Sequence, residues 1–137
     1  MLKWCPALVV GASILASCSN TSPAPANQFP ATGAYDLTVT EVGHDDHYPS
    51  KPLDASTQQK LIDLIMTEMD GCSGEPDVAG GKIAAQLSCE IMGRTYAMNI
   101  AGSYSPTSID METTLTGGSL GPHVETRHYK LVKPFKL

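Results

Sequence analysis

The densest group of side chains that could do chemistry is the run His44-Asp45-Asp46-His47. Two imidazoles and two carboxylates are ligand types that hold Zn2+ or Cu2+ in proteins. The run lies within residues 43–52, whose glycine, prolines and charges predict an exposed loop with no fixed scaffold for a metal. His44, Asp46 and His47 are therefore weak candidates, a solvated acidic loop is the simpler interpretation, and we predict no metal and no cofactor.

Two other patterns could serve catalysis. Residues 117–121 read Gly-Gly-Ser-Leu-Gly, which matches the G-x-S-x-G pattern of serine hydrolases by letter. That pattern needs a helix after the serine, whereas Pro122 and a predicted strand follow in this chain, so we interpret the segment as a glycine-rich turn. Asp110 and Glu112 share one strand face, as catalytic carboxylates would, but the alternation places them on the solvent-exposed face. We predict that the protein is not an enzyme.

Basic residues gather near the C-terminus, at Arg127, Lys130, Lys133 and Lys136. Such a cluster could contact anionic lipid headgroups, glycan polymers or an acidic partner. A solubilising edge strand and tail is the simpler interpretation, because lysine on an edge blocks association between sheets.

The first 18 residues have the layout of an export signal. Lys3 gives a cationic start, residues 7–16 are an apolar run too short to span a membrane, and the run ends as Leu15-Ala16-Ser17-Cys18. This ending resembles the processing box of bacterial lipoproteins, in which the cysteine takes up diacylglycerol and further acyl chains such as palmitate. We expect a signal peptide at 1–17, lipidation of Cys18 and a contact with the lipid bilayer through its acyl chains. The alternative is an ordinary cleavable signal in which Cys18 is incidental.

Localisation and disulfide pairing follow from this interpretation. Ser19 is not the Asp that retains many lipoproteins at the inner membrane, so we expect the cell envelope, on the outer membrane and facing the periplasm. That compartment is oxidising, and processing leaves Cys72 and Cys89 as the two remaining thiols. We expect a disulfide between them, with two buried free thiols as the alternative.

Length and composition limit the number of domains and the classes of partner. The 137 residues fit one domain, and the net charge of −5 with a pI near 5.2 argues against phosphate-driven binding of nucleic acid. Alternation predicts a strand at 35–40, an amphipathic helix at about 55–70 capped by Ser56 or Asp54, and about four strands from Ile83 onward. The sequence thus predicts an α+β fold, an antiparallel β-sheet meander of about five strands with one helix packed on one face. The expected organisation is a signal peptide (1–17), a flexible proline-rich tether (18–33) and a single domain (34–137).

The stretch from Cys89 to Gly117 carries a family resemblance. It reads Cys89-x-Ile-x-Gly-x-x-Tyr-x-Met-x-Ile-x-Gly-x-Tyr104, then Thr107-Ser-x-x-Met-x-x-Thr-x-x-Thr-Gly117. With the Gly33-x-Tyr35 opening and the central Cys72, it resembles a domain-of-unknown-function family of small exported bacterial β proteins. The resemblance implies an envelope location and an antiparallel sheet, and it carries no catalytic residues. The chain departs from the family where many members have a further C-terminal cysteine.

Three function classes remain. The first is a periplasmic lipoprotein with a non-catalytic binding or scaffolding role for an unidentified protein or envelope polymer. The second is an inhibitor of a cell-wall hydrolase that inserts a protruding loop, at 44–51 or 117–122, into the enzyme. The third is a carrier of a small apolar ligand, which would need a dry pocket beneath the helix. That pocket would be lined by Leu61, Ile65, Met69, Met98 and Met111.

Overall fold

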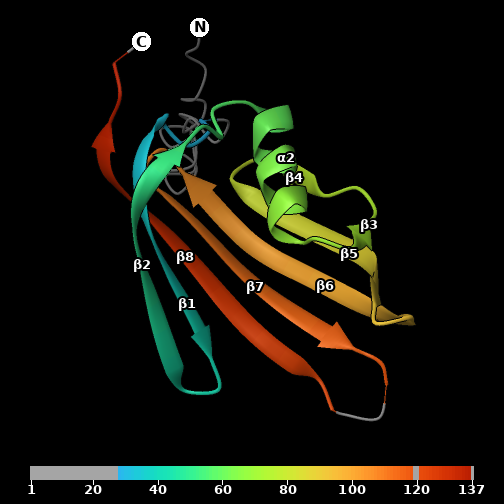
Figure 1. The fold of residues 1–137 in the computed structure, drawn as a ribbon. Coiled ribbons are helices and arrows are strands. Elements are labelled where there is room, and N and C mark those ends of the chain that lie inside the picture. Colours follow the sequence, from blue (N-terminus) through green and yellow to red (C-terminus); the bar gives the residue numbers. More distant parts are fainter. Residues whose placement is uncertain (1–27, 119–120, 137) are drawn as a thin grey trace, which may run out of the picture.

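One antiparallel sheet makes up most of the domain in the computed structural model, which describes residues 28–118 and 121–136 (Figure 1). Along the chain the elements are β1 (Gly33–Glu41), β2 (His44–Leu53), α2 (Gln58–Glu68), β3 (Cys72–Ser73), β4 (Asp77–Ala79), β5 (Lys82–Ile91), β6 (Arg94–Ser105), β7 (Ser108–Thr116) and β8 (His123–Pro134). The strand order is β2-β1-β8-β7-β6-β5-β3, and β4 also pairs with β5. The expected antiparallel α+β fold is confirmed, but the sheet has eight strands rather than about five.

The extra strands are β2, β3 and β4, and β2 forms where the sequence predicted a loop. Residues 44–53 pair with β1, with one interruption at Pro49 and Ser50, and form the edge strand β2, so the loop predicted at 43–52 is wrong. Pro49 and Pro52 are tolerated because the outer side of an edge strand needs no hydrogen-bond donors. They also prevent another chain from pairing with this edge. The short strands β3 and β4 lie between α2 and β5 and cover part of the β5 edge.

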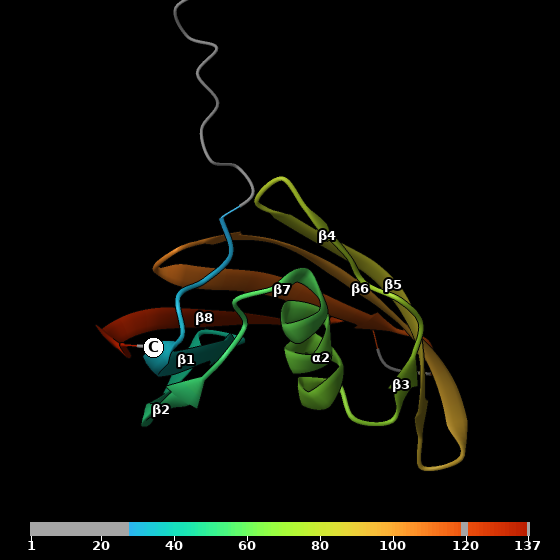
Figure 2. The ribbon, with the colours of Figure 1, turned by 90° about the horizontal axis from the view of Figure 1, so that it is seen from above.

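The helix α2 lies inside the curve of the sheet, which bends around it when seen from above (Figure 2). Leu61 and Ile65 on its inner face are fully buried. The helix spans 58–68, within the expected 55–70, but its N-cap is Thr57 rather than Ser56 or Asp54, because the Thr57 side chain accepts the Lys60 N–H at 3.1 Å.

The core fills the space between α2 and the concave face of the sheet. Alternate residues of the central strands point inward, and with the helix they form one cluster of buried side chains, which includes Tyr35, Leu37, Ile83, Leu87, Ile100, Ile109, Met111 and Tyr129. Gly102 permits a close approach between β6 and β7, since a Cβ there would lie 2.1 Å from the carbonyl oxygen of Asp110.

The described chain begins with a packed segment before β1. Phe29 stacks on Tyr104 with ring centroids 5.1 Å apart, and the Ala31 N–H donates to the carbonyl of Pro106 at 3.0 Å. Pro30 is fully buried. Residues 28–33 of the predicted tether are thus part of the folded domain, whereas the predicted signal peptide, Cys18 and the rest of the tether lie outside the described residues.

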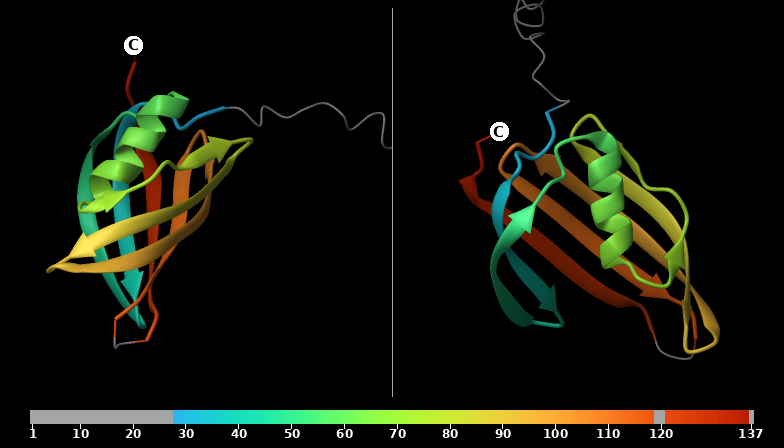
Figure 3. Two further views of the ribbon diagram at one scale, coloured as in Figure 1. Left: turned by 90° about the vertical axis from the view of Figure 1, so that its right-hand side faces the viewer. Right: turned by 45° about the horizontal axis from the view of Figure 1, so that its top comes forward.

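The two ends of the sheet differ. The segment before β1 and the end of β8 lie at the end where α2 begins, and the β1–β2 and β5–β6 turns lie at the opposite end (Figures 1 and 3). Val42-Gly43 and Met92-Gly93 form these two-residue turns with positive φ at both positions, as tight hairpins require. Within residues 28–118 and 121–136, no helix has the length and apolar character needed to cross a membrane.

Candidate functional site

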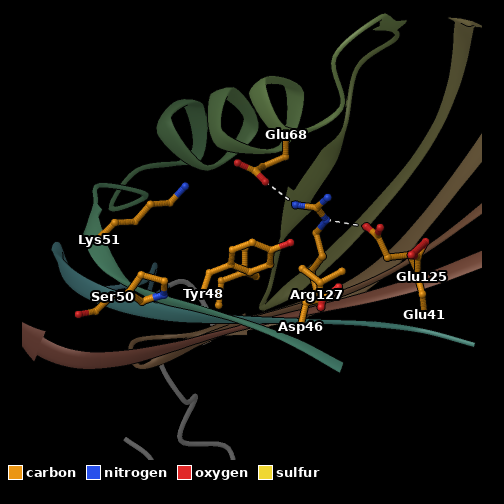
Figure 4. Close-up of a pocket in the computed structure, with 11 residues that line it drawn as sticks. Glu41, Asp46, Tyr48, Ser50, Lys51, Glu68, Glu125 and Arg127 are labelled. Carbon is orange, nitrogen blue, oxygen red and sulfur yellow. Dashed lines mark hydrogen bonds and ion pairs between the residues drawn. The ribbon is translucent and has the colours of Figure 1, made fainter. Parts of the chain in front are cut away.

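A cavity of about 490 Å3 opens on the concave face of the sheet, beside the C-terminal half of α2 (Figure 4). The helix covers one end of the concave face and leaves this part of β2, β1 and β8 open. The lining residues are Leu37, Val39, Glu41, Asp46, Tyr48, Pro49, Ser50, Lys51, Glu68, Glu125 and Arg127. Its volume lies in the range of about 300–1,000 Å3 typical of sites for small ligands.

The cavity has an apolar floor and charged walls. Leu37 and Val39 of β1 form the floor, and both are at least nine-tenths buried. The Tyr48 ring stands between Lys51 and Arg127 in Figure 4. This arrangement suits an elongated molecule with an apolar body and polar ends.

An ion-pair network joins the helix to the sheet at this cavity. The Arg127 guanidinium donates through Nη1 to Glu68 of α2 and through Nε to Glu125 of β8, the latter at 2.7 Å. The three side chains are 17–20% exposed. Burial lowers the pKa of Arg127, but the hydrogen bond and charge of Glu125 outweigh it and hold that pKa above its usual value. Arg127 thus stays charged and bound between two carboxylates.

The same three residues border a second, smaller hollow of about 240 Å3 on the far side of Arg127. Its apolar lining includes Met69, Met98 and Leu115. The Glu68–Arg127–Glu125 network therefore separates two hollows beneath the end of the helix.

A β-bulge in β2 determines which side chains enter the cavity. Tyr48 pairs with Leu37 and Lys51 pairs with Tyr35, so Pro49 and Ser50 together oppose the single residue Asp36. Without the bulge, strict alternation would place Lys51 on the opposite face from Tyr48. The bulge turns the Lys51 side chain into the cavity, where it points toward the helix (Figure 4).

Tyr129 lies under the network and is fully buried. Burial raises the pKa of its hydroxyl, and the negative charge of nearby Glu68 raises it further. No hydrogen bond of standard geometry satisfies this hydroxyl within the described part of the chain.

We expect Tyr129→Phe to leave the free energy of unfolding at pH 7 unchanged or to raise it by about 1 kcal/mol, because it removes an unsatisfied buried hydroxyl. The folded-state pKa of Tyr129 exceeds the unfolded value of about 10, so its contribution to stability is present below pH 10 and declines as pH rises further. Urea unfolding from pH 7 to 11 measures this. The variant should lose less stability than the wild type above pH 10; equal losses would contradict the assignment.

The structure separates the weak metal candidates of the sequence. His44 and Asp46 point to the concave side, with His44 Nε2 3.0 Å from Asp46 Oδ1, while His47 Nδ1 lies 3.1 Å from Thr38 Oγ1 on the convex side. This is the alternation of a strand, which the loop interpretation did not foresee. Among the residues described, no cluster of three or more His, Cys, Asp or Glu side chains could hold a metal ion.

The other candidate groups are distributed as follows. Asp110 points to the convex face and forms an ion pair with His128, and Glu112 is exposed on the same face. Ser119 lies outside the described residues. Of the basic cluster, Lys130, Lys133 and Lys136 are exposed, whereas Arg127 faces the cavity and is not part of a solubilising tail.

The dry pocket expected for a carrier of apolar ligands is not where the sequence placed it. Leu61, Ile65 and Met111 pack inside the closed core, and Met69 and Met98 border only the smaller hollow. Residues 44–51, one of the two loops expected for an inhibitor, form a paired strand. The cavity observed is lined in part by charged side chains and lies beside the helix rather than beneath it.

The sequence did not identify Tyr48, Lys51 or Glu68 as residues of the cavity. It singled out Arg127, but as part of a basic cluster rather than as a residue that lines a cavity. Glu68 lies three residues after the buried Ile65, on the helix face that packs on the sheet. A carboxylate on an apolar face indicates a buried cationic partner, so this position held the usable signal.

The disulfide between Cys72 and Cys89 is confirmed. The two residues are paired in register between β3 and β5, which ties the segment after α2 to the sheet. The disulfide therefore stabilises the wall of the smaller hollow, to which Cys72 belongs.

Comparisons of the chain with protein-family models, with curated proteins and with solved structures find no match.

Proposed function

We propose that this protein is a lipid-anchored component of the bacterial envelope, held at the outer membrane and facing the periplasm, whose domain binds a small ligand without catalysing a reaction. The cavity beside α2 is the observation that supports a binding role over a purely structural one. Its volume of about 490 Å3 and its apolar floor with charged walls are the features of a ligand site. Among the carboxylates around it, Glu68 and Glu125 are held by Arg127, and Glu41 contacts His123 at 2.6 Å.

The anchor rests on the sequence that ends at Cys18. Two or three acyl chains hold a protein firmly at a bilayer, whereas one holds it only marginally. We expect the native chain, produced in a Gram-negative host, to incorporate labelled palmitate and to sediment with membranes. Cys18→Ala should abolish both. Sedimentation of this variant with membranes would contradict the anchor.

Ligand binding is tested with a fluorescent reporter in the cavity. Trp4 is the single tryptophan of the sequence and precedes Cys18, so in a chain starting at residue 18 Tyr48→Trp supplies the only indole. A matched control is Phe135→Trp, which places the reporter on the C-terminal segment, away from the cavity lining.

Each reporter is titrated with neutral, anionic, cationic and zwitterionic fragments of drug-like size. We expect at least one class to change the emission of the Tyr48→Trp protein saturably and to leave that of the Phe135→Trp protein unchanged. If no class does so, or if both reporters respond alike, the cavity is not a ligand site.

A further inference from the structure

We propose that the cavity beside α2 selects an extended zwitterion, a molecule with a carboxylate at one end, an amine at the other and an apolar body between them. This inference rests on the binding role proposed above and names the chemical class of the ligand. It follows from the distribution of charge along the cavity, from the bulge in β2 and from the network that holds Arg127.

One end of the cavity is cationic because of Lys51. This residue is level with Tyr35 in the strand register, near the end of the sheet that α2 covers. Within residues 28–118 and 121–136 it forms no ion pair and no side-chain hydrogen bond, unlike Lys60, which contacts Asp54 at 2.7 Å. A β-bulge directs the Lys51 side chain inward, so its ammonium group is available to a ligand.

The other end is acidic. Asp46 is level with Val39, and Glu41 lies two residues further along β1. Their ion-pair partners are the imidazoles of His44 and His123, and among the described residues neither carboxylate pairs with a lysine or arginine. Arg127 is level with Asp46 across Val39, but it is held by Glu68 and Glu125. An amine is the group that this end would attract.

The two ends are separated by the length of a short extended chain. Tyr35 and Val39, which mark the levels of Lys51 and Asp46, are four residues apart on β1, or about 13 Å at about 3.3 Å per residue. An extended peptide covers at most about 3.3–3.6 Å per residue, so three or four residues bridge this distance. Tyr48 and Leu37 pair at the level between them, and there the Tyr48 ring and the Leu37 side chain offer the surface on which an apolar body would pack.

Arg127 also carries a positive charge at the cavity, but it is not the site that would bind the carboxylate of a ligand. Its Nη1 and Nε are held by Glu68 and Glu125, and all three side chains are at least four-fifths shielded from water. An anionic ligand that displaced either carboxylate would leave that carboxylate without its partner in a poorly hydrated place, which is costly. The carboxylate of a ligand therefore goes to Lys51.

The test uses the tetrapeptide Ala-Leu-Ala-Ala with free termini and three capped forms: N-acetylated, C-amidated and doubly capped. A fifth probe, 8-aminooctanoate, has the same two charges on an alkyl chain without peptide groups. Calorimetric titration is done on the wild-type chain starting at residue 18 and on its Lys51→Met and Asp46→Asn variants. The matched controls are Lys130→Met and Asp36→Asn, which change the same residue types on the convex face.

We expect the free tetrapeptide to bind the wild-type domain and both controls equally well. Capping the carboxylate should weaken binding to the wild type about tenfold, as expected for loss of a charged hydrogen bond, and should not change binding to Lys51→Met. Capping the amine should likewise weaken binding to the wild type about tenfold and should not change binding to Asp46→Asn. Comparable binding of 8-aminooctanoate would identify the two charges as sufficient, and much weaker binding would identify a peptide as the ligand; either result supports the zwitterion.

Equal affinity for free and doubly capped peptides would overturn the inference, as would a loss of binding in the controls equal to that in Lys51→Met and Asp46→Asn. Absence of any tetrapeptide or 8-aminooctanoate binding at millimolar concentration would overturn it too. These failures are distinguishable from failure of the proposed function. If the Tyr48→Trp reporter still responds to neutral or singly charged fragments, the cavity is a ligand site and only the zwitterion is wrong as its ligand class.

Discussion

Replacing Arg127 with methionine is expected to lower the free energy of unfolding by about 3 kcal/mol, because removal of one member of a largely buried ion pair leaves its partners uncompensated. Glu68 and Glu125 are 17% and 20% exposed and lose the same partner at once. Methionine preserves most of the apolar stem, so the change reports on charge more than on packing. Urea unfolding at pH 7 measures the effect.

The same ion-pair network predicts that further substitutions rescue this variant. Adding Glu68→Gln and Glu125→Gln to Arg127→Met should restore most of the lost stability, since the triple variant has no unpaired charge at this place. Lys60→Met is the matched control: it breaks the Lys60–Asp54 pair, whose side chains are 50% and 42% exposed, and should cost less than about 1 kcal/mol. Equal losses of unfolding free energy for Arg127→Met and Lys60→Met would show that the network does not stabilise the packing of α2 on the sheet.

Removal of the disulfide is the second change with a large expected effect. The Cys72→Ser, Cys89→Ser double variant opens a loop of sequence separation 17 and should lose about 3 kcal/mol in the chain-entropy model. The segment between α2 and β5 should also open more often. Hydrogen exchange at the Cys72 amide, which donates to Met69 at 3.1 Å, and at the Glu90 amide, which donates to Gly71 at 2.9 Å, reports this.

The wild-type protein with its disulfide reduced is the control for this variant. Reduction should lower the unfolding midpoint in urea by the same amount as the double substitution, because both remove one covalent link. A loss below about 1 kcal/mol in both would contradict the expectation, since it would indicate that the paired strands hold the segment without the disulfide.

The parts of the fold that alternate cleanly or repeat with helical period could be predicted from the sequence. In β7, Ile109, Met111 and Thr113 are buried on the inner face of the sheet. In α2, Leu61 and Ile65 are buried on the expected face. In each case one face is buried against an apolar layer, which imposes the period on the residues.

Strand β2 could not be predicted because all of its residues before Leu53 are exposed, so neither face carries a run of buried apolar side chains. Asp46 faces a cavity with charged walls and His47 faces solvent, so both positions of the alternation are polar. Pro49, which ordinarily signals a loop, is accommodated by an edge strand with a bulge.

The residues of the cavity could not be predicted from the sequence either. Arg127 lies in a basic stretch that resembles a tail, and its position between two carboxylates depends on the pairing of β8 with β1 and on the packing of α2. Lys51 enters the cavity through a bulge that no alternation pattern reveals. Contacts set by strand register and by a bulge therefore required the structure, whereas the disulfide followed from counting the cysteines.

The most direct test of ligand binding beside α2 is a 1H–15N NMR titration of the wild-type domain with the fragment or peptide that gives the strongest response. Binding in the cavity should shift the amides of Leu37, Val39 and Tyr48 and those at the end of α2, and the shifts should be lost in a Val39→Trp variant whose thermal unfolding is still cooperative. Shifts on the convex face around Asp110 and His128, or saturable binding that Val39→Trp leaves intact, would contradict a ligand site beside the helix.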